Sequence, residues 1–105
     1  MSTSKGIRLM RYGDIVHLQG SGSYTTIHLI DGSKTVASHN LAYYDRLLQH
    51  RSFFRTHQSH IINTKYLKMF CTEEREALLE GEKQIPVSKL KRGKLIERIE
   101  EEFVG

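Results

Sequence analysis

FFRTHQSHIIN, residues 53–63, sets six consecutive polar side chains between two pairs of apolar ones. Phe53–Phe54 and Ile61–Ile62 are residue types that pair in sheets and become buried. The polar run 55–60 contains no Gly, Pro or Asp, the residues typical of an ordinary turn. A core strand would bury these polar groups at a large cost in free energy. The pattern therefore predicts a tight polar excursion whose two ends are anchored by apolar residues.

The segments around this stretch are mostly strand-like. β-Branched and aromatic residues, in part alternating with polar ones, predict strands at 14–18, 24–30, 34–38, 66–70, 76–80 and 83–87. Hairpin turns are predicted at 31–33, where Gly32 can supply a positive φ, and at 81–82. The small polar segment QGSGS, residues 19–23, is predicted to be a loop. Because Pro86 cannot donate to a ladder, the last strand is expected at a sheet edge.

Two further segments have helical periodicity. Apolar positions in residues 39–50 recur at helical spacing, which predicts a short helix with Tyr44 in the core. Asn40 or Ser38 can cap this helix. A second helix is predicted from its cap Ser88 onward, with an apolar stripe of Leu90, Ile96, Ile99 and Phe103. The order of elements predicts a mainly β fold of antiparallel hairpins with a short middle helix and a C-terminal helix.

The composition limits the class of protein. A chain of 105 residues suits one domain, and we expect residues 1–6, MSTSKG, to be disordered and residues 7–105 to form that domain. No apolar run is long enough to span a membrane, and the N-terminus lacks the apolar region of a secretory signal. Cys71 is the sole cysteine, so no internal disulfide can form and a reducing cytoplasm is the expected location.

Positive charge is unevenly distributed along the chain. The net charge is +4 with a pI near 9.3, yet residues 73–105 carry nine acidic residues against seven basic ones. Within that acidic end, residues 83–98 hold six Lys and Arg against Glu97 alone. A local positive field suits a polyanion such as nucleic acid, and the alternative is a solvated basic helix face.

The sequence offers little for catalysis or metal binding. His57 and His60 are separated by two residues and have no third ligand nearby, whereas a zinc site needs about three or four convergent ligands. The segment GSGS, residues 20–23, lacks the Lys-Ser/Thr of a phosphate-binding loop, and no nucleophile elbow is present. The remaining histidines are scattered and expected to be exposed or to flank helices: His17, His28, His39 and His50. We therefore expect neither an enzyme nor a cofactor.

Polar segments of the chain carry side chains that suit nucleic acid. Gln is a bidentate partner for adenine, and Lys pairs with guanine or phosphate. No helix-turn-helix, zinc-finger or RNA-recognition aromatic signature is present. If the chain binds DNA, it is expected to do so through loops on a sheet scaffold.

Four blocks of the sequence resemble the LytTR family of bacterial DNA-binding domains. They are DIVHLQGSGSYTTIHLIDG (14–32), NLAYYDRLL (40–48), FFRTHQSHIINTKYLKMF (53–70) and IPVSKLKRGKL (85–95). The family pattern has a strand, a small polar loop and an aromatic strand, followed by a helix. A Phe-x-Arg-x-His-x-Ser segment ending in Asn then precedes a Pro-Val-Ser segment that opens the last helix. The resemblance covers residues 14–98.

The resemblance implies an elongated, mostly antiparallel β domain whose loops, rather than a recognition helix, enter successive major grooves. Carried over to this sequence, it implies DNA-binding residues in three segments: Ser23, Tyr24, His57, Gln58, Lys89 and Lys91. The polar run 55–60 would then be a DNA-contacting loop held by its apolar flanks. Family members commonly have Arg or Asn where Gln58 stands and Arg where Lys89 stands, so the usual base preferences do not carry over directly.

Three residues of the 53–63 stretch have structural alternatives. Arg55 is expected to satisfy loop carbonyls, and Asn63 is expected to close the loop by hydrogen bonding. For His57, a loop buttress and a phosphate contact are equal alternatives.

The sequence thus predicts a sequence-specific regulator of bacterial transcription that binds double-stranded DNA, with two copies on repeated half-sites. The alternative is a protein-interaction module on the same scaffold that has lost DNA binding. Most family members carry an N-terminal receiver domain, which this sequence lacks. The chain is therefore expected to be either a stand-alone regulator or an output domain that works with a receiver domain or a kinase-linked partner. No membrane association is expected.

Overall fold

The computed structural model describes residues 2–3, 6–7, 9–49 and 51–103, with side chains from Leu9 onward. Within these residues the strands are β1 (Ser2–Thr3), β2 (Gly6–Ile7), β3 (Ile15–Ser21), β4 (Tyr24–Leu29), β5 (Lys34–Ala37), β6 (Phe53–His57), β7 (His60–Asn63), β8 (Leu67–Cys71), β9 (Glu76–Leu79) and β10 (Lys83–Pro86). The helices are α1 (Leu41–Leu47) and α2 (Arg92–Glu102), and the 3₁₀ turns are η1 (Tyr12–Asp14), η2 (Thr64–Tyr66) and η3 (Lys89–Lys91).

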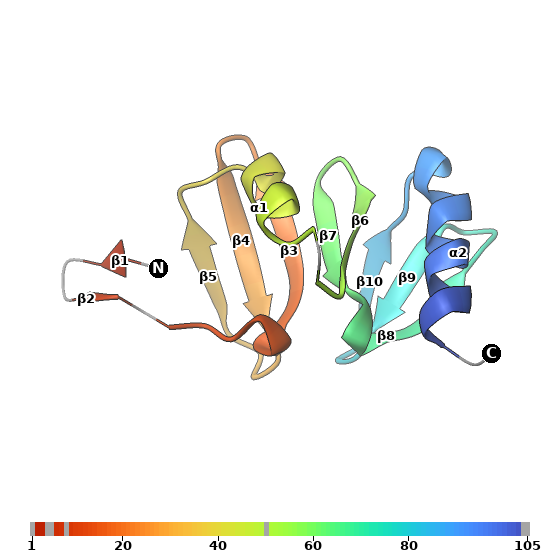
Figure 1. The fold of residues 1–105 in the computed structure, drawn as a ribbon, viewed down its shortest axis with the longest axis horizontal. Helices are drawn as coiled ribbons and strands as arrows, with labels where there is room; N and C mark the ends of the chain where they lie inside the picture. Colours follow the sequence, from red (N-terminus) through yellow and green to blue (C-terminus); the bar gives the residue numbers. More distant parts are fainter. Residues whose placement is uncertain (1, 4–5, 8, 50, 104–105) are drawn as a thin grey trace.

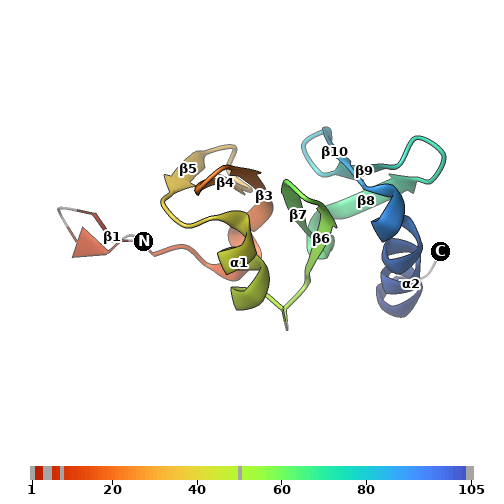
Figure 2. The same ribbon diagram turned by 90° about the horizontal axis from the view of Figure 1, so that it is seen from above.

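Two antiparallel sheets lie side by side along the long axis of the molecule (Figure 1). The five-stranded sheet has the order β5-β4-β3-β7-β6, and the three-stranded sheet has the order β10-β9-β8. α1 covers one face of the five-stranded sheet (Figure 2), and α2 lies beside the three-stranded sheet (Figures 1 and 2). With extents of 45 × 25 × 24 Å, the molecule is elongated. The predicted fold class, mainly β with a short middle helix and a C-terminal helix, is confirmed.

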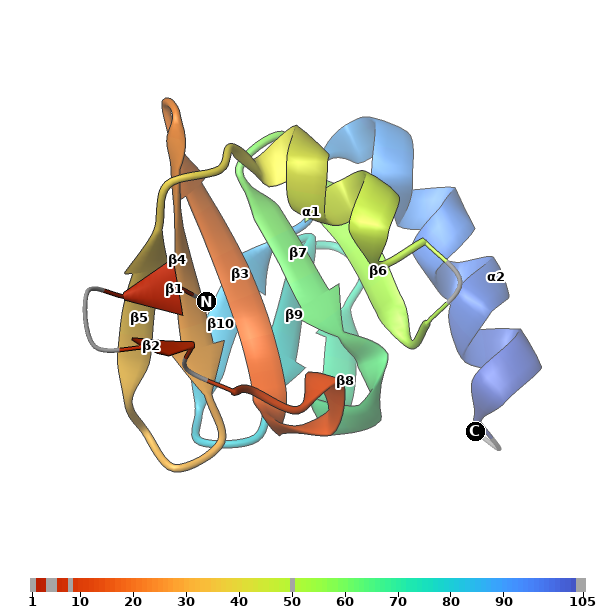
Figure 3. The same ribbon diagram turned by 60° about the vertical axis from the view of Figure 1, so that its left-hand side comes forward.

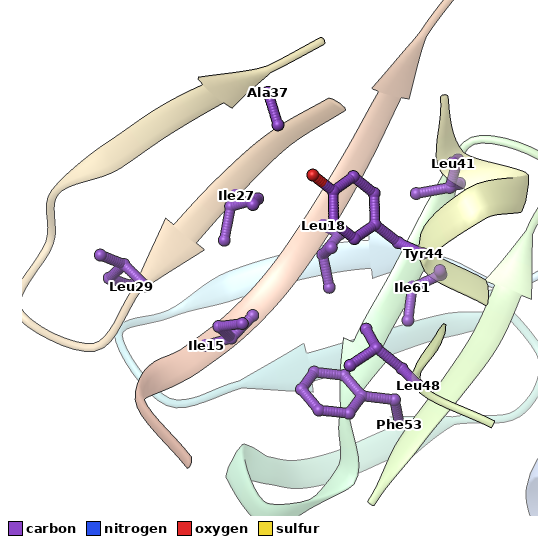
Figure 4. Close-up of a cluster of buried hydrophobic side chains, with 10 residues drawn as sticks. All are labelled: Ile15, Leu18, Ile27, Leu29, Ala37, Leu41, Tyr44, Leu48, Phe53 and Ile61. Atoms are coloured by element: carbon purple, nitrogen blue, oxygen red, sulfur yellow. The ribbon is translucent and has the colours of Figure 1, made fainter. Parts of the chain in front are cut away.

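The central strands β3 and β7 are covered on both faces. Neighbouring residues of a strand point to opposite sides of the sheet, and the register shift between Ile15 and His17 turns Val16 to the side opposite Leu18. Leu18 and Ile61 face α1, whereas Val16 and Ile62 face the three-stranded sheet. The first cluster lies between the five-stranded sheet and α1 (Figure 4): Ile15, Leu18, Ile27, Leu29, Ala37, Leu41, Tyr44, Leu48, Phe53 and Ile61. The second cluster joins the two sheets and α2: Val16, Ile62, Tyr66, Ala77, Leu79, Ile85, Val87 and Leu95. Tyr44 is therefore a core residue, as predicted.

The predicted turns and the cap of the first helix are confirmed. Gly32 between β4 and β5 has a φ of +89°, and Gly81 between β9 and β10 has a φ of +84°. Gly adopts positive φ without the steric penalty of a side chain. Asn40 caps α1, because its Oδ1 accepts a hydrogen bond from the Tyr43 N–H at 3.0 Å. Pro86 lies on β10, an edge strand, where its missing N–H is tolerated.

The segment 19–23 forms a shorter loop than predicted. β3 continues to Ser21, which pairs with Tyr24 of β4, so only residues 22–23 form the turn. Gly22 supplies the positive φ, +59°, that this tight turn uses. The polar composition is compatible with a strand here because the side chains next to the turn are exposed to solvent.

The C-terminal helix begins later than predicted. Ser88 makes no side-chain cap and is followed by η3, so α2 begins at Arg92. Leu90 therefore lies outside the helix and is 89% exposed, and Phe103 follows the last helical residue and is also exposed. Leu95, which is fully buried, anchors α2 in the second cluster. The predicted apolar stripe is thus wrong at both of its ends.

The N-terminal segment predicted to be disordered is described only in part. β1 pairs with β2, and Met1, Ser4 and Lys5 lie outside the described residues, so the disorder stays a prediction. In the part of the chain that the structure describes, no helix has both the length and the apolar character needed to cross a membrane.

Candidate nucleic-acid interface

Three connections lie along one long edge of the molecule, which is the upper edge in Figure 1 and in Figure 3. They are the β3–β4 turn (22–23), the β6–β7 turn (58–59) and the η3 segment that leads into α2. We call this surface the loop edge. Its first two connections belong to the five-stranded sheet, and the third follows the three-stranded sheet.

All six residues predicted to bind DNA belong to the loop edge or begin or end a strand beside it: Ser23, Tyr24, His57, Gln58, Lys89 and Lys91. His57 and Lys91 are half-buried, and the other four are exposed. The fold therefore brings together side chains that come from three separate parts of the sequence.

Gln58 stands between two hollows of the loop edge. One hollow lies toward the β3–β4 turn and is also lined by Gly22 and Ser59. The other lies toward η3 and is also lined by Leu90 and Lys91. Gln58 thus lies between the other two connections of the loop edge. A ligand that extends along the whole loop edge would therefore lie next to its side chain.

The β6–β7 hairpin is a strand pair with a short turn rather than a long loop. His57 pairs with His60, so only residues 58–59 form the turn. The predicted six-residue excursion is therefore wrong in length, because four of its six residues belong to the strands β6 and β7. The register shifts between Arg55 and His57, and Thr56 at this irregularity is fully buried. Such an irregularity re-aims the side chains of one strand without ending the pairing.

Arg55 holds the β6–β7 turn. Its Nη2 donates to the Gln58 carbonyl at 2.7 Å, and its Nε donates to the His57 carbonyl at 3.3 Å. Its Nη1 lies 3.3 Å from a carboxylate oxygen of Asp45 in α1. Gly, Asn and Asp usually stabilise a turn of this kind, and this turn contains none of them. The Arg55 guanidinium stabilises the turn instead by donating hydrogen bonds to its carbonyls. The expectation that Arg55 satisfies loop carbonyls is confirmed.

His57 also supports this turn. Its Nδ1 accepts a hydrogen bond from the Ser59 N–H at 3.1 Å. An accepting Nδ1 requires the neutral tautomer that carries its proton on Nε2. The contact is the one expected of a loop buttress, and a phosphate contact by His57 stays a prediction.

Two further hydrogen-bonding residues fix β6 and β7, the strands of this hairpin, to the rest of the fold. The Ser88 N–H donates to the Thr56 carbonyl at 2.7 Å, which joins the segment before η3 to β6. Asn63, fully buried at the end of β7, accepts from Ser52 Oγ at 2.7 Å and donates from Nδ2 to the Ile15 carbonyl at 2.8 Å. The predicted hydrogen-bonding role of Asn63 is confirmed.

Three histidine rings from neighbouring strands stack on one another. They lie on the face of the five-stranded sheet that is turned toward the three-stranded sheet. His17 of β3 stacks on His28 of β4 at 4.8 Å and on His60 of β7 at 5.2 Å between ring centroids. His17 Nε2 lies 3.0 Å from His60 Nδ1, and Lys83 Nζ of β10 lies 3.4 Å from His28 Nδ1. The expectation of an exposed His17 is wrong: it is 3% exposed, because β3 is covered on both faces.

Burial holds this histidine stack in its neutral form. The pKa of His17 is lowered to about 3, chiefly by burial and in addition by the nearby His28, His60 and Lys83. Burial also lowers the pKa of His28, with a contribution from Lys83, and the pKa of His60, with a contribution from His57. Neutral rings can pack closely between two sheets, whereas protonated ones would repel one another.

The other histidines lie apart from this stack. His39 is exposed before α1 and stacks on Tyr43 at 3.9 Å, as expected for a helix-flanking residue, and His50 lies outside the described residues. Among the residues described by the structure, no group of three or more His, Cys, Asp and Glu is arranged to hold a metal ion.

α2 carries its charges in the order opposite to the one that stabilises a helix. Acidic residues are favoured at a helix N-terminus and basic ones at the C-terminus, by about 0.3–1 kcal/mol each. Here Lys89, Lys91 and Arg92 lead into the N-terminal end, and residues 100–102, all Glu, form the other end. The basic end lies at the loop edge and the acidic end at the opposite edge (Figure 1). Charges that oppose helix stability point to an anionic partner at the loop edge.

The fold is a β scaffold whose turns gather polar and basic side chains on one surface, the loop edge. The family model of the LytTr DNA-binding domain matches residues 5–100, so the chain belongs to the LytTR family. This is a DNA-binding domain family of transcription regulators and not a family of enzymes. The resemblance noted from the sequence is confirmed.

Solved structures give the same fold. The chain is similar to the LytTr DNA-binding domain of a protein described as a methyl-accepting/DNA response regulator from Bacillus cereus, with a TM-score of 0.72. The two are 19% identical, and the match covers 94% of this chain and 90% of that chain. A comparison with curated proteins gives no match.

Proposed function

We propose that the chain binds double-stranded DNA with sequence specificity through the loop edge, as an output domain for bacterial transcription regulation in the cytoplasm. The observation that carries the proposal is the basic end of α2, set on the same edge as two turns with exposed polar side chains. Cations alone would hold any phosphate backbone. The exposed side chains of Ser23, Tyr24 and Gln58 add groups that can contact base edges.

Gln58 is the proposed base reader. Its side-chain amide has one acceptor and two donor hydrogens, which match the N7 and N6 edge of adenine. Arg55 and His57 hold the backbone of the turn in place. Because the turn is already ordered, little conformational entropy is lost when its side chain contacts a base.

The other proposed contacts flank Gln58 on both sides. Lys89 and Lys91 approach DNA from η3, and Ser23 and Tyr24 approach it from the β3–β4 turn. His57, whose Nδ1 is engaged within the hairpin, is proposed to donate from Nε2 to a phosphate. This division gives cations at one end of the loop edge and neutral hydrogen-bonding groups at the other.

The size of the molecule supports two copies on repeated half-sites. Its long axis of 45 Å compares with about 34 Å for one turn of B-DNA, so one copy covers little more than one turn. A longer operator then requires a second copy. One copy that saturates the whole preferred site would contradict this. Because the Bacillus cereus domain belongs to a response regulator, we infer that a receiver domain or a kinase-linked partner supplies the signal here too.

The test is a binding series on duplexes varied one base pair at a time, starting from a sequence selected from random duplex DNA. Gln58→Ala should lose about 1–3 kcal/mol on the preferred site and little on random DNA. Gln58→Arg should move the preference at one base pair from adenine toward guanine. Gln84→Ala is the matched control, because Gln84 is exposed on β10 and should not affect binding.

Three results would separate the proposal from its alternatives. Equal losses for Gln58→Ala on preferred and random DNA would show that Gln58 is not a base reader. A salt titration tests the protein-interaction module, since DNA binding through several cations makes log K fall steeply with log salt concentration. Failure to bind any duplex at low salt would reject the proposed function.

A further inference from the structure

Leu90 is an apolar side chain in the most basic part of the loop edge. It is 89% exposed and lies between Lys89 and Lys91 in η3. It also lines the hollow that borders Gln58. A single exposed Leu is ordinary on a protein surface, so its exposure alone has no meaning. Its position matters, because it shares a hollow with the proposed base reader.

The fold does not use the Leu90 side chain. Leu95 rather than Leu90 anchors α2, and Leu90 belongs to neither hydrophobic cluster. The chain before η3 is fixed through its backbone, because the Ser88 N–H donates to the Thr56 carbonyl. A role for Leu90 therefore concerns what lies against the loop edge.

A partner that covers Leu90 must accept an apolar group with an ammonium group on either side. An apolar protein surface suits this poorly, because Lys89 and Lys91 would be desolvated without anionic partners. The major groove of DNA suits it well: phosphates line the groove, and the C5-methyl of thymine is an apolar group on its base edges. We infer that Leu90 recognises thymine by packing against this methyl group.

This inference rests on the proposed DNA binding and adds a second specificity determinant to it. Gln58 and Leu90 line the same hollow, so the thymine lies in the same stretch of groove as the adenine contacted by Gln58. Gln58 would make two hydrogen bonds to a base, whereas Leu90 would make an apolar contact. Because the two interactions differ, each can be tested without the other.

Replacing one thymine by deoxyuridine isolates the contact. The change removes the C5-methyl and keeps every phosphate and every hydrogen-bonding group of the base pair. Burial of one methyl group changes affinity about fourfold. At the thymine contacted by Leu90, the unaltered chain should bind the deoxyuridine duplex about fourfold more weakly. Leu90→Ala should bind the two duplexes about equally at that position.

Two variants serve as controls. Leu90→Met keeps an apolar side chain and should retain the discrimination between thymine and deoxyuridine. Leu9→Ala is matched in residue type and exposure, because Leu9 is 88% exposed. Its segment leads into η1 at the edge opposite the loop edge (Figure 1), so this variant should discriminate as the unaltered chain does. Thermal melts should show the same fold for all three variants, since both leucines are outside the core.

The outcomes separate this inference from the proposed function. The inference is overturned if Leu90→Ala discriminates as strongly as the unaltered chain, or if it loses equal affinity on both duplexes. It is also overturned if no thymine of the preferred site responds to deoxyuridine in the unaltered chain. Each of these results leaves DNA binding standing. Absence of sequence-specific binding by the unaltered chain would overturn the proposed function and the inference with it.

Discussion

Acidification from about pH 7.5 to about pH 5 should destabilise the fold through the histidine stack. His17 is held between His28 and His60, and its pKa is lowered from 6.5 to about 3. Between these two values the unfolded chain binds a proton that the folded chain excludes. Stability is therefore complete above about pH 6.5 and falls as the pH falls toward about 3.

The two pKa values of His17 set the size of the effect. At about pH 5 the proton bound by the unfolded chain lowers the free energy of unfolding by about 2 kcal/mol relative to about pH 7.5. His28 and His60 act in the same direction, because burial lowers the pKa of each. A domain of this size has roughly 5–15 kcal/mol of stability, so the loss is large enough to measure.

Urea unfolding at the two pH values measures this loss. His17→Gln removes the titrating ring, so its free energy of unfolding should fall much less on acidification, whatever its stability at neutral pH. His39→Gln is the control, because His39 is exposed outside the stack and its variant should keep the full loss. A His17→Gln chain that loses as much stability as the unaltered chain would refute the reasoning.

Three further predictions concern the scaffold and the loop edge. Arg55→Ala should lower the melting temperature by about 5 °C, because two turn carbonyls lose a donor, and an unchanged melt would show that the turn stands without it. Leu95→Ala should lower the free energy of unfolding in urea by about 2–5 kcal/mol, because it empties a fully buried site. A loss below about 1 kcal/mol would mean that α2 is anchored elsewhere. Lys91→Ala should weaken binding to all duplexes alike and reduce the salt slope by about one unit, while Lys68→Ala on distant β8 should leave the slope unchanged.

Local patterns predict much of this fold because its hairpins form between neighbours along the chain. The turn at Gly32 and the cap at Asn40 have partners within a few residues, so their residue types identify them. The loop edge is different, because its first two turns become neighbours only through the pairing of β3 with β7. No local signal reports that pairing, and the burial of His17 follows from the same contact.

In the candidate site, the roles that follow from side-chain chemistry were predictable from the sequence. The positions that depend on strand pairing and on where the helix begins were less predictable. Arg55 and Asn63 have donors that suit backbone carbonyls, and both make such bonds. The length of the β6–β7 turn was missed, since polar residues are tolerated in a strand whose side chains reach solvent. Leu90 fits a helical stripe by spacing, but η3 precedes the helix and leaves this side chain at the surface.

The pairing of β3 with β7 also affects how quickly a newly synthesised chain forms the loop edge. The hairpins β3–β4 and β6–β7 pair residues that are near in sequence. In contrast, His17 of β3 pairs with Ile62 of β7, although β4, β5, α1 and β6 lie between them in the sequence. Closing so long a loop loses chain entropy before the contacts compensate, and non-local pairing of this kind slows folding. A newly synthesised chain can form both hairpins and still lack the loop edge, because that surface exists only after β3 has paired with β7. The time this closure takes is therefore a built-in delay between synthesis and the recognition of DNA.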